Sequence, residues 1–540
     1  MNRAGKHTGA AHRAGSGGAA LALAIAFALP LDAQSLQAGR PLNAIDWLED
    51  AMSHPLPPDM TGIDDPDIQT APDEDGTAIS VTPLLPPTLD QVGLFVPERA
   101  GLPRELWGNA AVAEVLAGIS ALPVDTVPSA LQLEYRLLLA EFASPVQLQP
   151  ETQGTVLNAR VDKLMAMGAL EQATQLIDAA PVRTAALNTR AFDIALLLGE
   201  EDRACASMSG QITTDFGHGA QIFCLARRGD WQAAYMMLNA TKSLGLLEAS
   251  EAALLLRFLE EEDATFTPPP PAELSPLGWR ILEALGDPVP TASLPVAYAY
   301  ADLRGTSGWR AQLDAAERLT RAGVMQPNRL LGLYAQRRPA ASGGVWERVR
   351  AVQALDQALA TGNSAAVSQA LATAWPQFVS VELEVAFAQM FAEILAEALA
   401  DGPVQPHTLD GAARGIIWHI LLLAQTGLDL ATQMTPNSGA AQLATALATG
   451  QTDLPPVSNA SMAAAIAQAF TSPMAQADDA PQPPASSGGI ILLDALNNIA
   501  HAAIGDPRAA RLGLQGLLSL GLDDAARQIA VELLLLERRG

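Results

Sequence analysis

The only two cysteines of the chain, Cys205 and Cys224, have a spacing that allows one covalent cross-link. Each falls in an apolar segment typical of a helix, and the residues between them are centred near Thr214, so a helical hairpin would place the two thiols side by side. In an oxidising compartment this arrangement favours a disulfide. Free buried thiols are one alternative. A metal site is another, although two thiols with the nearby His218 fall short of the four ligands that zinc prefers.

A short basic loop, residues 337–346, is the stretch best suited to binding an anion. It lies between two segments with helical periodicity, and small residues at a helix start can expose backbone N–H groups that suit a carboxylate. The candidate partner-binding residues here are Arg337, Arg338, Ser342, Gly343, Gly344 and Trp346. In the alternative interpretation the loop is a tight helix connection, and its arginines, with Arg348 and Arg350, pair with nearby acids.

The histidines and carboxylates form no recognisable catalytic motif. The chain has no HExxH, no GxSxG and no phosphate-binding GxxxxGK[ST] sequence. His419 follows a strongly apolar stretch and is interpreted as a packed histidine. The acidic run at 260–263 is interpreted as a solvated linker, because glycoside hydrolysis needs two carboxylates held across a sugar. We therefore expect no catalytic residue, no metal and no cofactor.

Three glycines at a nearly constant spacing indicate the elements that position these residues. Gly168, Gly199 and Gly229 are 31 and 30 residues apart, and each is followed five residues later by an alanine. Glycine suits the left-handed conformation at a helix end, and a small alanine lets two helices approach closely. A repeat of about 30 residues built from two short helices is the signature of a helical solenoid. The sequence therefore predicts an all-α fold, an α-solenoid of stacked helical hairpins.

The remaining chain divides into segments with different composition. Ala- and Leu-rich helical stretches alternate with Pro-rich connections. We expect a helical-repeat region at 98–265, a second helical region at 274–470, a flexible linker at 473–489 and a three-helix C-terminal cap at 490–540. Helices are expected in the second region at 277–285, 308–322, 344–361, 367–374, 381–400 and 409–426.

The turn at Gly229-Asp230-Trp231-Gln232-Ala233-Ala234 resembles the turn between the two helices of a tetratricopeptide repeat. The other two turns lack the aromatic residue, so the resemblance is to a degenerate array of about 80 residues. The overall layout is similar to that of exported bacterial helical-repeat proteins of unassigned role. The helices also resemble, in architecture alone, the helical ring of some soluble lytic transglycosylases, whose catalytic domain has no counterpart here.

The first hundred residues have the composition of an export signal and a leader. Three basic residues precede an apolar run of 11 residues, Ala19 to Leu29, and cleavage is expected near Ala33. An uncleaved anchor is the alternative, although a spanning helix needs about 20 residues. Residues 34–97 are acidic and Pro-rich and are expected to be disordered. Within them, a short helix at 43–52 carries Trp47 and Leu48, which would dock on a partner or on the chain's own helices.

Charge and composition restrict the function. The net charge is −26, and it becomes −28 once residues 1–33, with three basic residues and one acid, are removed. Such a chain repels nucleic acid, and no stable membrane insertion is expected after signal cleavage. We expect a periplasmic scaffold or adaptor that binds other cell-envelope proteins. The alternative is an envelope enzyme acting on peptidoglycan or glycan, with a site assembled only in three dimensions.

Overall fold

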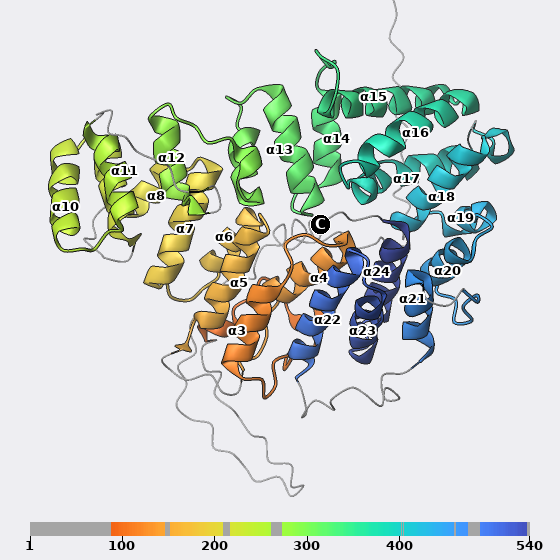
Figure 1. Cartoon of the computed structure of the whole chain (residues 1–540), viewed down its shortest axis with the longest axis horizontal. Helices are drawn as coiled ribbons and strands as arrows, with labels where there is room; N and C mark the ends of the chain where they lie inside the picture. The colour runs from red at the N-terminus through yellow and green to blue at the C-terminus, as the bar shows by residue number, and fades with distance from the viewer. Residues whose placement is uncertain are drawn as a thin grey trace, which may run out of the picture. The chain divides into compact units, whose positions relative to one another are not determined.

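The computed structural model describes residues 88–145, 152–208, 216–260, 270, 273–400, 402, 404–457, 461–472 and 487–536 (Figure 1). These residues form helices and contain no strand, only one isolated β-bridge between Phe95 and Ala140. The prediction of an all-α fold is therefore confirmed. The predicted signal peptide, the short helix at 43–52 and most of the linker at 473–489 lie outside the described residues.

The predicted turns at Gly168, Gly199 and Gly229 are confirmed. Their φ angles are 81°, 80° and 85°, in the left-handed region that a residue with a Cβ rarely adopts. The following helix is capped at Asp230, whose side chain accepts the Ala233 N–H at 3.3 Å. The helices of this part are η1 (Leu89–Gln91), α2 (Pro97–Ala100), α3 (Val112–Ala121), α4 (Pro128–Leu139), α5 (Thr155–Ala166), α6 (Leu170–Asp178), α7 (Ala185–Leu198), α8 (Glu201–Ser207), α9 (His218–Arg227), α10 (Trp231–Ser243) and α11 (Ala249–Glu260).

The helices predicted after residue 274 are found close to their expected positions. This part contains α12 (Pro276–Ala284), η5 (Thr291–Ser293), η6 (Val296–Leu303), α13 (Trp309–Arg321), α14 (Pro327–Ala335), α15 (Val345–Thr361), α16 (Ser364–Val379), α17 (Glu384–Ala400), η7 (Pro406–Thr408), α18 (Gly411–Leu423), α19 (Leu428–Met434), α20 (Gly439–Ala448) and α21 (Met462–Thr471). The long 3₁₀ segment η6 was not predicted, because it follows prolines that indicate a loop.

The two predicted helical regions pack against each other through the turn glycines. A Cβ at Gly168 would lie 3.0 Å from Cγ1 of Val296, and a Cβ at Gly199 would lie 3.2 Å from Cδ of Arg304. Val296 is the first residue of η6, and Arg304 directly follows its last residue. These glycines are therefore needed for close approach as well as for their backbone angles.

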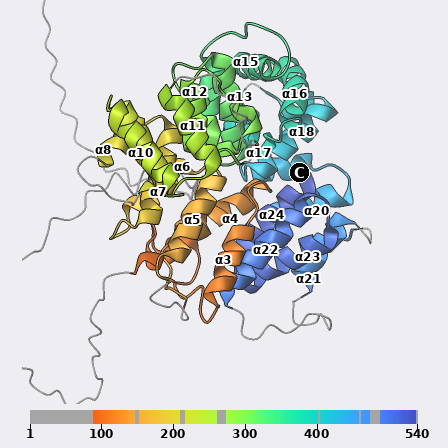
Figure 2. The same ribbon diagram turned by 60° about the vertical axis from the view of Figure 1, so that its left-hand side comes forward.

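The last three helices contact helices from both parts of the chain. They are α22 (Gly488–Ala503), α23 (Pro507–Ser519) and α24 (Asp523–Leu535). Helix α22 packs on α3, α24 packs on α4 and α20, and α23 packs on α21. Figure 1 and Figure 2 both show the orange helices α3 and α4 beside the blue α22 and α24. The three predicted helices are present. They do not form the expected terminal cap, because a cap would contact helices on one side only, and these three contact helices from both parts of the chain.

The prediction that residues 34–97 are disordered is wrong for their last ten residues, the part that the structure describes. Residues 88–97 contain η1 and the start of α2, and Asp90 in η1 is only 2% exposed. Its carboxylate accepts the N–H groups of Gly154, Val156 and Leu157 at 2.6, 2.9 and 3.1 Å, so it caps the N-terminus of α5 from outside that helix. Composition alone did not show this, because the capping residue lies about 65 residues before the helix.

None of the helices in the described residues is both long enough and apolar enough to span a bilayer.

Candidate functional site

Cys205 and Cys224 form a disulfide, as predicted. Cys205 lies in α8 and Cys224 in α9, and their Cα atoms are 5.3 Å apart. The two residues are 4% and 1% exposed. The bond therefore fastens one helical hairpin to the next in a buried position and leaves neither sulfur free to bind a metal.

The loop at 337–346 is held by groups of the protein itself. The Gly343 N–H donates to Oε1 of Glu347 at 3.0 Å, and Arg350 donates to the same carboxylate at 2.5 Å and to the Ala341 carbonyl at 2.7 Å. The hydrogen bonds from Arg350 and from the Gly343 N–H lower the pKa of the Glu347 carboxyl. One of the N–H groups expected to receive a partner's carboxylate, that of Gly343, thus already binds a carboxylate of the protein itself.

Arg337 and Arg338 are not part of this arrangement. Both side chains are exposed, and neither forms an ion pair with a carboxylate among the described residues. The backbone at this point is fixed instead by Gln353, whose amide donates to the carbonyls of Tyr334 and Arg337 at 2.8 Å. The loop therefore presents two adjacent guanidinium groups that its own hydrogen bonds do not use.

Two other residues of this stretch serve the core. Trp346 packs on Trp309 with ring centroids 5.0 Å apart. Arg348, one of the arginines that bracket the loop, pairs with Glu317, as one of the two interpretations expected; its guanidinium is 8% exposed, and Glu317 also accepts the Tyr334 hydroxyl at 2.7 Å. Burial raises the pKa of Glu317, and the hydrogen bond and charge of Arg348 oppose that shift. The pairing of Arg348 with a carboxylate agrees with the interpretation of this stretch as a helix connection.

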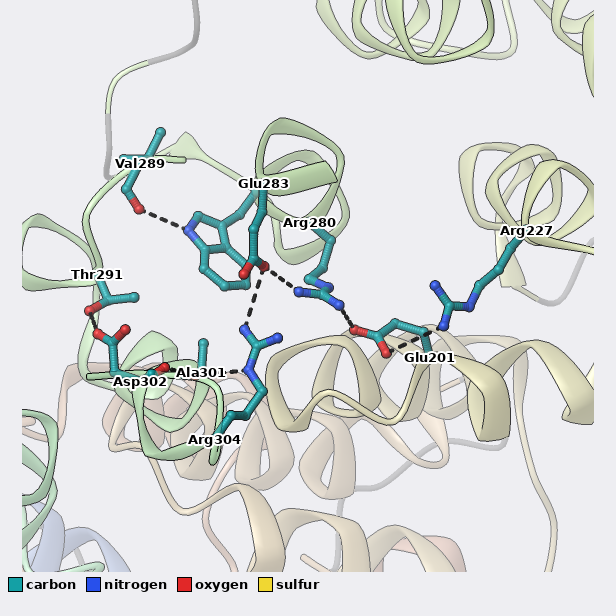
Figure 3. A network of polar contacts seen from close by, with 11 residues as sticks. Glu201, Arg227, Arg280, Glu283, Val289, Thr291, Ala301, Asp302 and Arg304 are labelled. Carbon is teal, nitrogen blue, oxygen red and sulfur yellow. Dashed lines mark hydrogen bonds and ion pairs between the residues drawn. The ribbon is translucent and has the colours of Figure 1, made fainter. Parts of the chain in front are cut away.

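A second polar cluster joins α8, α9, α12 and the end of η6 (Figure 3). Arg280 of α12 forms ion pairs with Glu201 and Glu283, and Arg304 donates to Glu283 at 3.4 Å. Arg227 of α9 approaches Glu201 at 3.9 Å. Glu201 is 5% exposed, so its charge is stabilised mainly by these arginines. Of these contacts, only the i,i+3 pair of Arg280 and Glu283 has a signal in the sequence.

A small surface depression adjoins this cluster. Its volume is about 200 Å³, and it is lined by residues that include Trp279, Glu283, Thr291, Asp302 and Arg304. The Trp279 indole N–H donates to the Val289 carbonyl at 3.1 Å, and the Thr291 hydroxyl donates to Asp302. These lining groups already have partners within the protein. The cluster therefore fastens η6 to the hairpins, and the depression has room for a small polar group only.

Asp193 in α7 is a carboxyl whose pKa differs strongly from its ordinary value. Its pKa is raised to about 7, chiefly by burial, and the charges of Glu251 and Asp162 act in the same direction. The charge of Arg190 acts in the opposite direction, but the guanidinium of Arg190 binds Asp162 through two hydrogen bonds of 2.6 and 2.5 Å. Glu251 in turn interacts with the charge of His218 at the start of α9. A carboxyl that titrates near neutral pH is suited to proton transfer.

Two further predicted features have different outcomes. His419 is packed as expected, between Trp375 and Trp418, and its Nδ1 lies 2.9 Å from the Gly415 carbonyl. Burial lowers its pKa.

Trp47 and Leu48 lie outside the described residues. Within the described ranges, no group of three or more His, Cys, Asp or Glu side chains is placed to hold a metal ion.

Comparison of the chain with models of protein families, with curated proteins and with solved structures finds no match.

Proposed function

We propose that this protein is an exported, periplasmic scaffold that binds other proteins of the cell envelope. In this proposal, its helical hairpins form a degenerate tetratricopeptide-like solenoid behind a cleaved signal peptide and an acidic, disordered leader. Such arrays bind partners over extended surfaces and need no active site. The left-handed turns at Gly168, Gly199 and Gly229 support this interpretation of the architecture.

One observation carries the proposal: Arg337 and Arg338 are adjacent, exposed and without an ion-pair partner among the described residues, in a chain of net charge −26. The loop that holds them is fixed by Glu347 and Arg350, so the fold does not require these two guanidinium groups. Arginine binds a carboxylate through paired hydrogen bonds, which gives direction as well as attraction. The two arginines therefore suit a carboxylate on an acidic partner.

A crosslinking pull-down from the envelope fraction tests this binding role. We compare the wild type with a double Arg337→Ala, Arg338→Ala variant and with a double Lys variant. The double Ala variant should lose the crosslinked partner, and the Lys variant should recover it poorly, because an ammonium group cannot make the bidentate contact. A matched control, Arg508→Ala with Arg511→Ala, removes two arginines of α23 instead. All variants must first show an unchanged melting curve. Equal recovery by every variant would refute the role of the loop.

The environment of Asp193 favours a second candidate, an envelope enzyme acting on peptidoglycan or glycan. Asp193 and Glu251 come from α7 and α11, and their charges interact. In glycoside hydrolysis one carboxyl group acts as the acid, and the raised pKa of Asp193 suits that role. The test is release of soluble fragments from purified peptidoglycan by the wild type and by Asp193→Asn. No release by the wild type would exclude this activity on peptidoglycan.

A further inference from the structure

Arg136 in α4 is a partly buried arginine whose side chain forms no hydrogen bond and no ion pair with any of the described residues. Burial lowers the pKa of its guanidinium, and no charged group among those residues counteracts this effect. Arginine keeps its charge at neutral pH. The positive charge of Arg136 is therefore held in a partly dehydrated position without a counter-charge from the described protein, which is energetically unfavourable.

The other arginines on which burial acts in this way all have partners. Burial acts to lower the pKa of Arg160, Arg318 and Arg348 as well. The guanidinium of Arg160 donates to three backbone carbonyls at 2.6–2.9 Å, and that of Arg318 donates to two at 2.7 and 2.8 Å. Arg348 binds the carboxylate of Glu317. Arg136 differs from these three, so the described part of the fold does not account for its burial.

Gln132 is a second polar residue beside Arg136 that has no protein partner. It lies four residues earlier in α4, so the two side chains are neighbours on one side of the helix. Gln132 is also partly buried, and its carboxamide forms no hydrogen bond with the residues that the structure describes. A guanidinium presents a planar fork of N–H donors, and a carboxamide presents an NH₂ group. The two side chains thus place several donors next to one another.

The carboxylate that α24 brings to α4 is used elsewhere on the helix. Glu532 accepts the N–H and the hydroxyl of Ser129, which lies seven residues before Arg136 and about 10 Å away along the helix axis. The chain contains 58 acidic and 32 basic residues, so carboxylates are plentiful. A desolvated arginine without one breaks the pattern of the rest of the protein. Such exceptions are expected at functional sites.

We propose that Arg136 and Gln132 form a binding site for a small oxyanion, a carboxylate or a phosphate group. The guanidinium donates two parallel hydrogen bonds to two oxygens of the anion, and the Gln132 carboxamide donates a third. The anion supplies the counter-charge. Arg136 is not completely buried, so the anion can reach it from solvent. This site is independent of the binding proposed for Arg337 and Arg338.

The test is the melting temperature of the full exported chain at pH 7 in sodium chloride, sodium acetate and sodium phosphate of equal ionic strength. Binding to the folded state raises the melting temperature with anion concentration. The wild type should therefore melt at a higher temperature in acetate or phosphate than in chloride, and the salt with the larger rise identifies the class of oxyanion.

Arg136→Met should lose the part of this rise that comes from binding. In chloride it should melt at the same temperature as the wild type or higher, because a charge without a counter-charge has been removed. Arg414→Met, at an exposed position in α18, is the matched control and should keep the rise of the wild type. General effects of the salts on stability act on all three proteins, so the difference between them reports binding.

Two milder variants test the geometry of the site. Arg136→Lys keeps the charge but loses the fork, so the dissociation constant, taken from the dependence of the melting temperature on salt concentration, should rise about tenfold. Gln132→Leu should raise it by a smaller factor. An equal rise in melting temperature for the wild type and Arg136→Met would overturn the proposal. A melting temperature of Arg136→Met in chloride far below that of the wild type would also overturn it, since Arg136 would then be structural.

Modification of arginine by phenylglyoxal, measured by peptide mass mapping, gives a direct readout. The oxyanion that raises the melting temperature should slow the reaction at Arg136 and leave the reaction at Arg414 unchanged. An equal rate at Arg136 with and without the oxyanion would contradict the proposal, because a bound anion covers the guanidinium.

Discussion

Glu532 caps the first turn of a helix that begins 404 residues earlier, by accepting two hydrogen bonds from Ser129. Its Oε2 accepts the Ser129 N–H at 2.8 Å, and its Oε1 accepts the Ser129 hydroxyl at 2.6 Å. Val127, the residue in the capping position of α4, makes no side-chain cap hydrogen bond. Glu532 is 1% exposed, so its carboxylate replaces the missing cap inside the protein. The contact joins the last helix α24 to the early helix α4.

The first prediction concerns this contact. Replacing Glu532 by Ala leaves the buried donors of Ser129 without a partner, and each such donor costs about 1–3 kcal/mol. We therefore expect a clear loss in the free energy of unfolding, measured in urea, and a smaller loss for Glu532→Gln. A double-mutant cycle with Ser129→Ala isolates the pair, and its coupling energy should exceed about 1 kcal/mol. Additive single effects would show that the two residues do not depend on each other.

The second prediction concerns the disulfide between Cys205 and Cys224. The two residues are separated by 19 positions, and a loop of this size contributes about 3 kcal/mol through the restricted unfolded state. Replacing both cysteines by Ser should lower the free energy of unfolding by about that amount. Wild type unfolded in the presence of a reductant serves as the control and should match the double variant. Thiol titration of denatured, non-reduced wild type should find no free thiol; two thiols per chain would reject the bond.

The sequence predicted the features that depend on residues close together in the chain. The turn at Gly199 requires a left-handed backbone angle, so it leaves a local pattern in the sequence. Helix positions followed from apolar periodicity in the same way. The Cys205–Cys224 pair could be predicted because the two cysteines are equally far along the chain from the middle of the connection between their helices, so antiparallel helices place them side by side.

The features that the sequence did not predict depend on contacts between residues far apart in the chain. Nothing near Glu201 indicates that Arg280 will pair with it, and nothing near Ser129 indicates Glu532. Pairing of Arg348 with an acid was one of two interpretations, but the sequence did not show that the acid would be Glu317, 31 residues earlier in the chain. The candidate loop was located correctly, but the sequence did not show that Glu347 occupies its Gly343 N–H. Long-range pairing of charges has no periodic signal.

The third prediction concerns the buried pair of Arg348 and Glu317. The two charged groups are 8% and 9% exposed, and Tyr334 donates a hydrogen bond to the same carboxylate. Glu317→Ala should destabilise the protein by about 3–5 kcal/mol, because it leaves a buried guanidinium without its counter-charge. Replacing both residues, Glu317→Leu with Arg348→Met, should cost much less. The measurement is urea unfolding. A double variant less stable than Glu317→Ala would contradict this explanation.

The last prediction concerns the pH dependence of stability that Asp193 produces. Burial raises the pKa of Asp193 from its ordinary value of 3.8 to about 7, so the folded state binds the proton more tightly than the unfolded state does. Below a pH of about 4 both states are protonated, and the group has no effect. As the pH rises from about 4 to about 7, ionisation of this carboxyl lowers the free energy of the unfolded state, while the carboxyl in the folded state keeps its proton. The contribution of Asp193 to stability therefore falls over this window and is constant above it.

Asn in place of Asp193 cannot ionise, so the free energy of unfolding of this variant does not include the decrease that Asp193 causes between about pH 4 and about pH 7. The difference in the free energy of unfolding between Asp193→Asn and the wild type should grow in favour of the variant from about pH 4 to about pH 7 and then level off. The exposed Asp453→Asn variant is the matched control for an Asp-to-Asn change elsewhere in the protein, measured over the same window. Comparing differences cancels the titration of all other groups. A constant difference for Asp193→Asn would mean that the carboxyl is ionised in the folded protein at these pH values. The Arg190 guanidinium would then have to stabilise Asp193 as well as Asp162, in spite of the two hydrogen bonds it already donates to Asp162.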